Sequence, residues 1–369
     1  MKKIYLKVAI TAIIIAACYY RYCGYMKDMN GYVGEGDYCL INEKGEVVSD
    51  LRIYDTVYAR DGDLGGALVI LENGWPRKDA RNHIACALLD SNGKIVLGPS
   101  YMWIRHRGQR LFNVEDELYD FTGNKMGKIV ELGHLGRFGK NGLAPLDNSM
   151  GRTSTGYIDT TGNYVIDNRF VAGDTFADNG LAAVENTEEL WGYIDETGSY
   201  VIEPQFIKAG MFSDGLAPVK ISDGHWAYIR ENGEIAFEVD CYEAEEFLHG
   251  CAVIRKDDSR YYIINTDGNR INNEDYEDAD ISIALDIITV CKNNRANFIG
   301  FDGKPIFDKT FDYAWEFSRN GLCAVCGDNG LWGYIGTDGE WVIEPVFEEA
   351  YPFDSKACVA VVKPVKPEN

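Results

Sequence analysis

Residues 191–206 read Trp-Gly-Tyr-Ile-Asp-Glu-Thr-Gly-Ser-Tyr-Val-Ile-Glu-Pro-Gln-Phe, and residues 332–347 read Trp-Gly-Tyr-Ile-Gly-Thr-Asp-Gly-Glu-Trp-Val-Ile-Glu-Pro-Val-Phe. Both copies keep the opening Trp-Gly-Tyr-Ile, a turn glycine and the run Val-Ile-Glu-Pro-x-Phe. Two such copies at distant places in one chain indicate an architecture built from internal repeats. The residues that they share show which positions each repeat needs.

The turn glycine of these copies recurs with a period of about 35 residues. It follows Thr, Asn or Asp, which are residues of tight hairpin turns. Weaker copies of the same turn extend the series toward the N-terminus and give nine units in all. The clear copies are Gly162, Gly198, Gly233, Gly268, Gly303 and Gly339, and the weaker ones are Gly45, Gly93 and Gly123.

Each unit repeats one internal pattern. An aromatic-Ile pair precedes the turn, and a β-branched run follows it. An aromatic-x-x-small-x-x-aromatic pattern and a glycine-led run such as 180–184 complete the unit. Short β-branched and aromatic runs between turns are typical of strands, so we predict an all-β fold with about three antiparallel strands per unit. The aromatic-Ile pairs are Tyr157-Ile158, Tyr193-Ile194, Tyr228-Ile229, Tyr262-Ile263, Phe298-Ile299 and Tyr334-Ile335.

Together, these motifs resemble the WG-repeat family of bacterial proteins. The resemblance is specific from about Gly156 to Val362 and weakens to the pattern alone between Tyr38 and residue 155. It implies a β-rich repeat array in a bacterial envelope or cytoplasmic protein, and it supplies no catalytic residues. We interpret the complete pairs, Trp191-Gly192 and Trp332-Gly333, as a structural repeat motif in which Trp buries a large area and Gly permits close backbone approach.

The array can be open or closed. One unit cannot bury a face alone, so neighbouring units must stack. A unit of about 35 residues is short for a propeller blade, and the divergent first units are similar to the caps of an open stack. We therefore expect an open or superhelical, β-solenoid-like array, and we keep propeller-like closure as the alternative.

The N-terminus has the parts of a secretory signal. Three lysines within the first seven residues precede the apolar run 8–17, which is too short to span a bilayer. The sequence Ile15-Ala16-Ala17-Cys18 resembles a bacterial lipobox, which implies cleavage between Ala17 and Cys18 and a lipid on Cys18. An uncleaved transmembrane anchor, extended by the tyrosines of 19–22, and conventional secretion are the alternatives.

These segments divide the chain into five parts. We expect a signal peptide or signal anchor at 1–17, a tether at 18–37, divergent repeats at 38–155, clear repeats at 156–362 and a polar tail at 363–369. The expected location is the cell envelope, membrane-anchored and outside the cytoplasm, although an uncleaved anchor could point the other way. A net charge of −22 disfavours nucleic acid and anionic lipid surfaces as partners, so attachment to a membrane requires a specific anchor.

The residues indicate no catalytic, metal or cofactor site. Cys241, Cys251 and Cys323 occupy apolar or small positions of the repeat, so we predict that they are buried hydrophobes. The acidic run 272–280 is the best calcium candidate, but it lacks the central Gly and terminal Glu of an EF-hand loop. The histidines are scattered singly, without ligand spacing.

We therefore expect a non-enzymatic, membrane-tethered module that binds or scaffolds an unknown protein or peptide through its repeat surface. The alternative is a carbohydrate or cell-wall binder that uses exposed aromatic side chains. Trp75, Trp103 and Trp315 lie at divergent or variable repeat positions and are its candidates.

Overall fold

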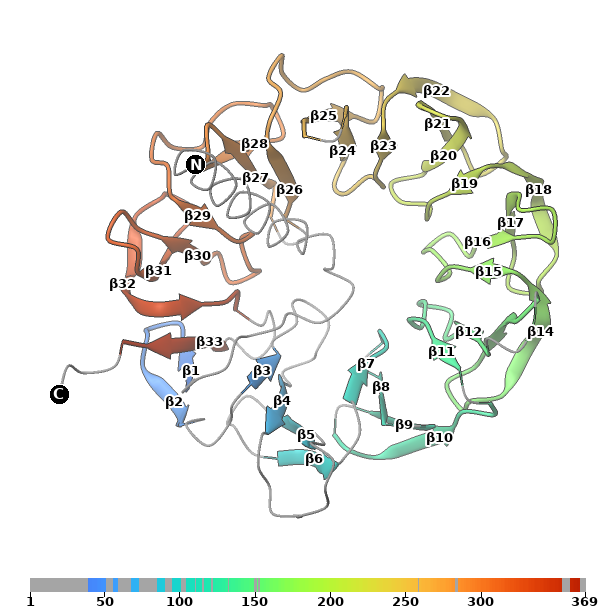
Figure 1. Ribbon diagram of the computed structural model, residues 1–369, viewed down its shortest axis with the longest axis horizontal. Coiled ribbons are helices and arrows are strands. Elements are labelled where there is room, and N and C mark those ends of the chain that lie inside the picture. The colour runs from blue at the N-terminus through green and yellow to red at the C-terminus, as the bar shows by residue number, and fades with distance from the viewer. Residues whose placement is uncertain are drawn as a thin grey trace, which may run out of the picture.

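Small antiparallel sheets follow one another around a ring (Figure 1). In the sheets that begin with β7, β11, β15 and β19, the first strand lies nearest the centre of the ring and the last strand lies at the outer edge. The all-β tandem array predicted from the sequence is confirmed. The computed structural model describes residues 39–50, 56–58, 68–72, 85–89, 95–100, 104–109, 111–114, 116–120, 122–131, 133–148, 151, 153–257, 259–282, 285–353 and 359–365.

The strands run in chain order within each sheet, except in the seven-stranded sheet, where β1 and β2 follow β33. They are β3 (Thr56–Tyr58), β4 (Leu68–Glu72), β5 (Ala85–Leu89) and β6 (Ile95–Ser100); β7 (Ile104–His106), β8 (Leu111–Val114), β9 (Glu117–Asp120) and β10 (Lys125–Lys128); β11 (His134–Leu135), β12 (Ala144–Asp147), β13 (Thr155–Ile158) and β14 (Tyr164–Phe170); β15 (Ala172–Gly173), β16 (Ala182–Glu185), β17 (Trp191–Ile194) and β18 (Tyr200–Phe206); β19 (Lys208–Ala209), β20 (Ala217–Ser222), β21 (His225–Ile229) and β22 (Ile235–Asp240); β23 (Glu243–Ala244), β24 (Cys251–Arg255) and β25 (Tyr261–Asn265); β26 (Asp278–Ile281), β27 (Ile287–Lys292) and β28 (Arg295–Gly300); and β29 (Tyr313–Ala314), β30 (Cys323–Cys326), β31 (Trp332–Ile335), β32 (Trp341–Ala350), β33 (Val359–Pro364), β1 (Cys39–Asn42) and β2 (Val47–Asp50).

The last of these sheets closes the ring. The C-terminal strand β33 pairs with β32 on one side and with β1 on the other, so that Cys39 lies opposite Val362. Residues from both parts of the seam, among them Ile41 and Ala360, share one buried cluster. The array therefore has the closed arrangement that the sequence offered as the alternative. Its divergent first units are joined to the last unit and do not form a free cap.

Most of the described sheets have four strands, one more than the sequence pattern suggested. The additional strand is the short inner one, such as β15 or β19, which has two residues within the aromatic-x-x-small pattern. The sequence unit therefore spans two sheets: it contains the outer two strands of one sheet and the inner two of the next. In the sheets of β25 and β28, the fourth strand is reduced to isolated bridges, Ile264 to Arg270 and Ile299 to Pro305.

A buried tyrosine joins each of several sheets to the next. Tyr193 on β17 is fully buried, and its hydroxyl donates to the carbonyl of Gly210 after β19, at 2.8 Å. Its ring centroid lies 4.8 Å from that of Phe212. Burial raises the pKa of Tyr193 well above its usual range, so the hydroxyl stays a donor. The same bond and ring pair recur at Tyr157 with Asp174 and Phe176, Tyr228 with Glu245 and Phe247, and Tyr334 with Tyr351 and Phe353.

The strand register corrects one of the aromatic-Ile pairs predicted from the sequence. Val253 pairs with Ile263, as Pro218 pairs with Tyr228 in the preceding sheet. Ile263 therefore occupies the tyrosine position, and the prediction of Tyr262-Ile263 as the aromatic-Ile pair was wrong by one residue. Tyr262 is half-buried and contacts Arg270 by a cation–π interaction at 4.2 Å.

The glycine of the Trp-Gly pair makes room for a bulge in the neighbouring strand. The register between β17 and β18 shifts between Trp191 and Tyr193, where Gly192 lies, and a Cβ on Gly192 would lie 2.5 Å from the carbonyl oxygen of Ile202. Gly333 meets Ile343 in the same way. Where Ala227 replaces this glycine, β21 and β22 pair residue for residue at that point. The glycine of the Trp-Gly motif is therefore required by a close backbone contact between two strands.

We expect Gly192→Ala to destabilise the protein by roughly 1–3 kcal/mol, because the new methyl group must displace backbone atoms of β18. Thermal unfolding followed by far-UV circular dichroism would measure the loss. Gly300→Ala is the matched control, since a Cβ there meets only the flexible Asp302 side chain closer than 4 Å. Equal melting temperatures for the two variants would contradict the role of the bulge.

We also expect Val362→Cys to form an intramolecular cross-link with Cys39, because these residues face each other across the seam. Oxidation or a short bifunctional thiol reagent, followed by peptide mapping, would detect it. Val361→Cys is the control because its side chain points to the other face of β33. If the linked peptide were absent from Val362→Cys, the ring would not be closed through β1 and β33.

Candidate binding sites on the ring

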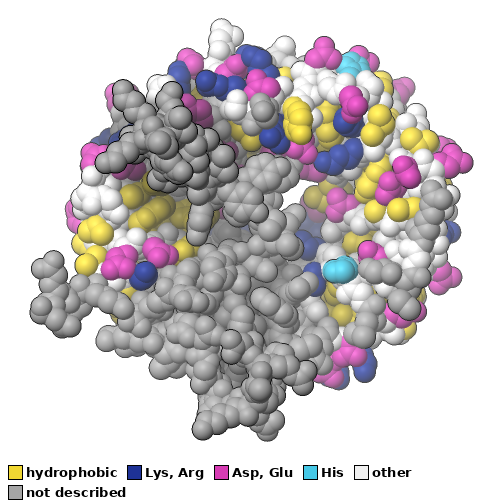
Figure 2. Space-filling view, viewed as in Figure 1, with side chains coloured by type: hydrophobic (Ala, Val, Ile, Leu, Met, Phe, Trp, Pro, Cys, Tyr) yellow, Lys and Arg dark blue, Asp and Glu magenta, His cyan; other side chains and the backbone are white. Residues whose placement is uncertain are grey.

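The loops of the sheets alternate between two faces of the ring because neighbouring strands are antiparallel. Loops from first to second strands and from third to fourth strands lie on one face, here called the turn face. Loops from second to third strands and connections between sheets lie on the other, here called the connection face. Charged side chains of both signs are interspersed on the surface in Figure 2.

A groove of about 620 Å³ crosses the turn face. Corresponding loops of four consecutive sheets line it, from the sheet of β7 to the sheet of β19. The lining segments are Gly108–Gln109, Arg137–Lys140, Thr175–Asn179 and Met211–Gly215, together with Glu231 from the turn between β21 and β22.

The groove has an apolar floor and charged walls. Phe138, Phe176 and Phe212 are buried beneath it, and the last two are the rings that pack on Tyr157 and Tyr193. The floor is therefore part of the core and is held rigidly.

Polar contacts between neighbouring loops fix the walls of the groove. Lys140 forms an ion pair with Asp178, and the Asn179 amide donates to Glu231 at 3.1 Å. The Asp214 carboxylate accepts the amide of Gly250 at 2.7 Å, from the next sheet along. These contacts join successive loops into one surface.

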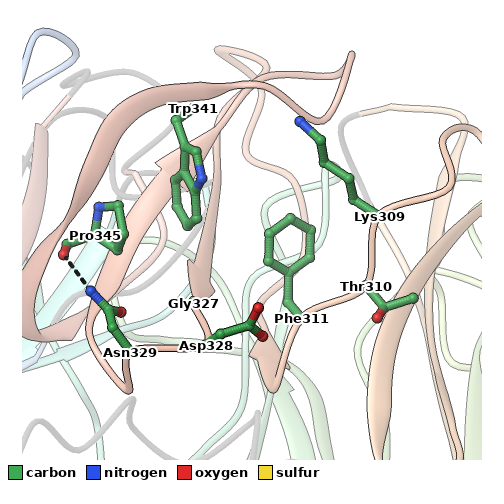
Figure 3. A pocket seen from close by; sticks show the side chains of 8 residues that line it. All are labelled: Lys309, Thr310, Phe311, Gly327, Asp328, Asn329, Trp341 and Pro345. Carbon is green, nitrogen blue, oxygen red and sulfur yellow. Dashed lines mark hydrogen bonds between the residues drawn. The ribbon is translucent and has the colours of Figure 1, made fainter.

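A second pocket, of about 310 Å³, lies beside Trp341 (Figure 3). Segment 309–311 leads into β29, segment 327–329 joins β30 to β31, and Trp341 and Pro345 belong to the outer strand β32. In Figure 3 the Trp341 and Phe311 rings face the pocket from two sides, and the Asp328 carboxylate points across its floor.

Polar contacts hold the walls of this second pocket. The Asn329 amide donates to the Pro345 carbonyl at 3.3 Å, and Lys309 reaches the Gly339 carbonyl at 3.1 Å. Arg295 donates to the Thr310 hydroxyl and to Asp328. The aromatic walls and their polar rim are therefore fixed in the structure without a ligand.

The site residues predicted from the sequence lie elsewhere. Trp191 and Trp332 are half-buried and pack against core clusters, and neither lines the groove or the second pocket. Ala17 and Cys18 lie outside the described residues, as do Trp75 and Trp103.

Trp315 is not an exposed binding platform. It is half-buried, packs against a core cluster and donates its indole N–H to the Ala350 carbonyl at 3.2 Å. Trp341, and not Trp315, lines the wall of the second pocket. Sequence reasoning missed it because Trp341 occupies the place of Tyr200 in the repeat and looked like core. The one signal in the sequence was the exchange of Tyr for Trp.

The cysteines and the acidic run have structural environments. Cys241, Cys251 and Cys323 are buried, as predicted. Burial raises the pKa of Cys241 to about 12 and that of Cys251 to about 11, so both thiols stay neutral. In the run 272–280, Asp275 pairs with Lys256 and Arg270 and Glu274 pairs with Lys292, so these carboxylates are neutralised by cations.

The described part of the chain has neither a metal-binding cluster nor a membrane-spanning helix. Its residues contain no group of three or more His, Cys, Asp or Glu that could hold a metal ion. Over the same ranges, no helix has the length and apolar character needed to cross a bilayer.

Family comparison agrees with the repeat geometry. Segments 156–188, 191–224, 298–331 and 332–363 match the family described as WG containing repeat. The chain carries WG containing repeats in four places. The WG segments begin at or near the third strand of a sheet and continue into the next sheet, as the offset between sequence unit and sheet requires. The segment 225–297 between them contains the sheet of β23, β24 and β25 and the first part of the sheet of β26, β27 and β28.

Several solved structures match the chain at low sequence identity. The "Crystal structure of the eukaryotic initiation factor" is 12% identical over 77% of this chain and 86% of that chain, with a TM-score of 0.53. BamB from Moraxella catarrhalis is 10% identical over 89% and 98%, with a TM-score of 0.41. Kluyveromyces lactis Hsv2 is 11% identical over 54% and 72%, with a TM-score of 0.36. No curated protein matches the chain.

Proposed function

We propose that this protein is a non-enzymatic binding or scaffolding module that holds an extended segment of a partner protein in the turn-face groove. The proposal rests on the lining of this groove, which is formed by corresponding loops of four consecutive sheets. A polypeptide lying along it contacts one loop after another, as in other repeat arrays with extended binding surfaces. The rigid floor of buried phenylalanines limits the conformational entropy lost when the partner binds.

Charge favours a basic partner segment. The groove is lined by the carboxylates of Asp178, Asp214 and Glu231 and by the cations of Arg137 and Lys140. Lys140 is already paired with Asp178, so the wall toward Asp214 and Glu231 is acidic. The net charge of −22 adds a field that attracts cationic partners and repels nucleic acid.

In the same proposal the ring is tethered to a bacterial envelope membrane and acts outside the cytoplasm. The lipobox-like sequence that ends at Cys18 supports this. A surface of this charge is repelled by anionic lipid headgroups, so the attachment in this proposal depends on the anchor alone.

Photo-crosslinking tests the groove. A photoreactive residue at Lys140 or at Glu231, both exposed, is expected to capture a partner protein in cells. The same residue at Glu188 or Asp223, which are exposed on the connection face, is expected to capture none of it. The partner's crosslinked peptide should be extended and basic. Capture of the same partner equally from both faces would contradict the assignment to the groove.

Charge reversal gives a second readout of the same prediction. Glu231→Lys is expected to weaken recovery of the crosslinked partner at least tenfold, because it places a cation where a basic segment would lie. Asp223→Lys is the matched control on the connection face, and its recovery should be unchanged.

A change at Cys18 tests the tether. The intact protein should incorporate an alkyne-labelled fatty acid and yield an N-terminal peptide that begins at Cys18. Cys18→Ala should lose the label and the cleavage. If Cys18→Ala stays in the membrane fraction with an unchanged N-terminus beginning at Met1, and the intact protein takes up no label, the chain has an uncleaved anchor.

A further inference from the structure

We propose that the pocket beside Trp341 binds a single saccharide unit. It lies on the connection-face side of a different sheet from the groove, so it is a separate site. Its volume of about 310 Å³ is at the lower end of the range for small-molecule sites. A ligand of one ring is therefore the size that fits.

The pocket exists because a short side chain replaces a long one. Phe311 and Trp341 have a counterpart in Phe170 and Tyr200, and both pairs are edge-to-face at similar distances, 5.9 Å and 6.2 Å. At the counterpart, Arg169 lies over the Phe170 ring at 5.1 Å and reaches the Gly198 carbonyl. The equivalent position beside Phe311 is Thr310, whose short side chain leaves the space over the ring open, while the neighbouring Lys309 takes over the bond to the turn carbonyl of Gly339.

The polar groups around this space suit a polyhydroxylated ring. Asp328 supplies an acceptor, the Lys309 ammonium supplies a donor, and the Asn329 amide has a hydrogen beyond the one donated to Pro345. Adjacent sugar hydroxyls both donate and accept, so they match neighbouring groups of these two kinds. The half-buried Trp341 offers an electron-rich aromatic face to the C–H groups of a pyranose.

Other ligand classes fit less well. Asp328 and the nearby Glu340 disfavour an anion, since Lys309 is already paired with Glu340. The rim groups are held by Arg295 and by backbone carbonyls, so they are pre-organised, as recognition of a small rigid ligand requires.

Saturation-transfer difference NMR tests the proposal with the full-length protein and the methyl glycosides of glucose, galactose and N-acetylglucosamine. At least one glycoside is expected to show transfer to its ring protons. Thr310→Arg, which copies the residue found at the counterpart and should fold, is expected to weaken that binding at least tenfold. Trp341→Ala should do the same.

Tyr200→Ala removes the corresponding aromatic at the filled counterpart and should leave glycoside binding unchanged. Absence of transfer for all three glycosides would overturn the proposal. So would binding that persists in Thr310→Arg with an unaltered melting temperature. If Trp341→Ala unfolds, Thr310→Arg decides alone.

Discussion

The bond from a buried tyrosine to the next sheet is the interaction on which the ring depends. A sheet of four short strands cannot bury both faces alone, so each must be held at a fixed angle to its neighbour. Tyr193 joins its sheet to the next by two interactions. Its hydroxyl donates a hydrogen bond to the Gly210 carbonyl, and its ring packs on Phe212. Loss of the hydroxyl would leave a buried carbonyl without its partner, at a cost of about 1–3 kcal/mol. Because Phe212 also lies under the groove, the joint that builds the ring also shapes the groove floor.

The joint is not equally complete around the ring. Phe298 keeps the aromatic pair with Phe317, at 5.2 Å, but has no hydroxyl to donate. Ile263 has neither the hydroxyl nor the aromatic ring of the tyrosine. The buried Ser282 occupies the position that the partner phenylalanine has in the other sheets. Ser282 donates to the Phe317 carbonyl, so it connects to the following sheet. Ile263 and Ser282 lie in the segment 225–297, between the matched segments, whereas Phe298 and Phe317 lie within the matched segment 298–331. The joint is therefore lost completely only where the family match is interrupted.

The sequence predicted the parts of the fold that local chemistry sets. Asp195 accepts two backbone amides and the Thr197 hydroxyl, which lowers its pKa, and Gly198 has a φ of 81°, so the hairpin turn was readable from its residues alone. The inner strands were not predicted because a strand of two residues is too short to show an alternation of apolar and polar side chains. Closure was under-weighted because pairing of β1 with β33 joins segments far apart in the chain. The groove and the pocket were missed for a related reason, since each is assembled from loops of several units.

The seam between β1 and β33 has a consequence for biosynthesis. The hairpin of β1 and β2 is made first, but its neighbour β33 is made last. Until then the hairpin exposes its strand edge and the side chains of Leu40 and Ile41, which are fully buried in the finished ring. An open strand edge of this kind can accept the β33 of another copy. Exchange of β33 between two copies would close each ring with its neighbour's last strand.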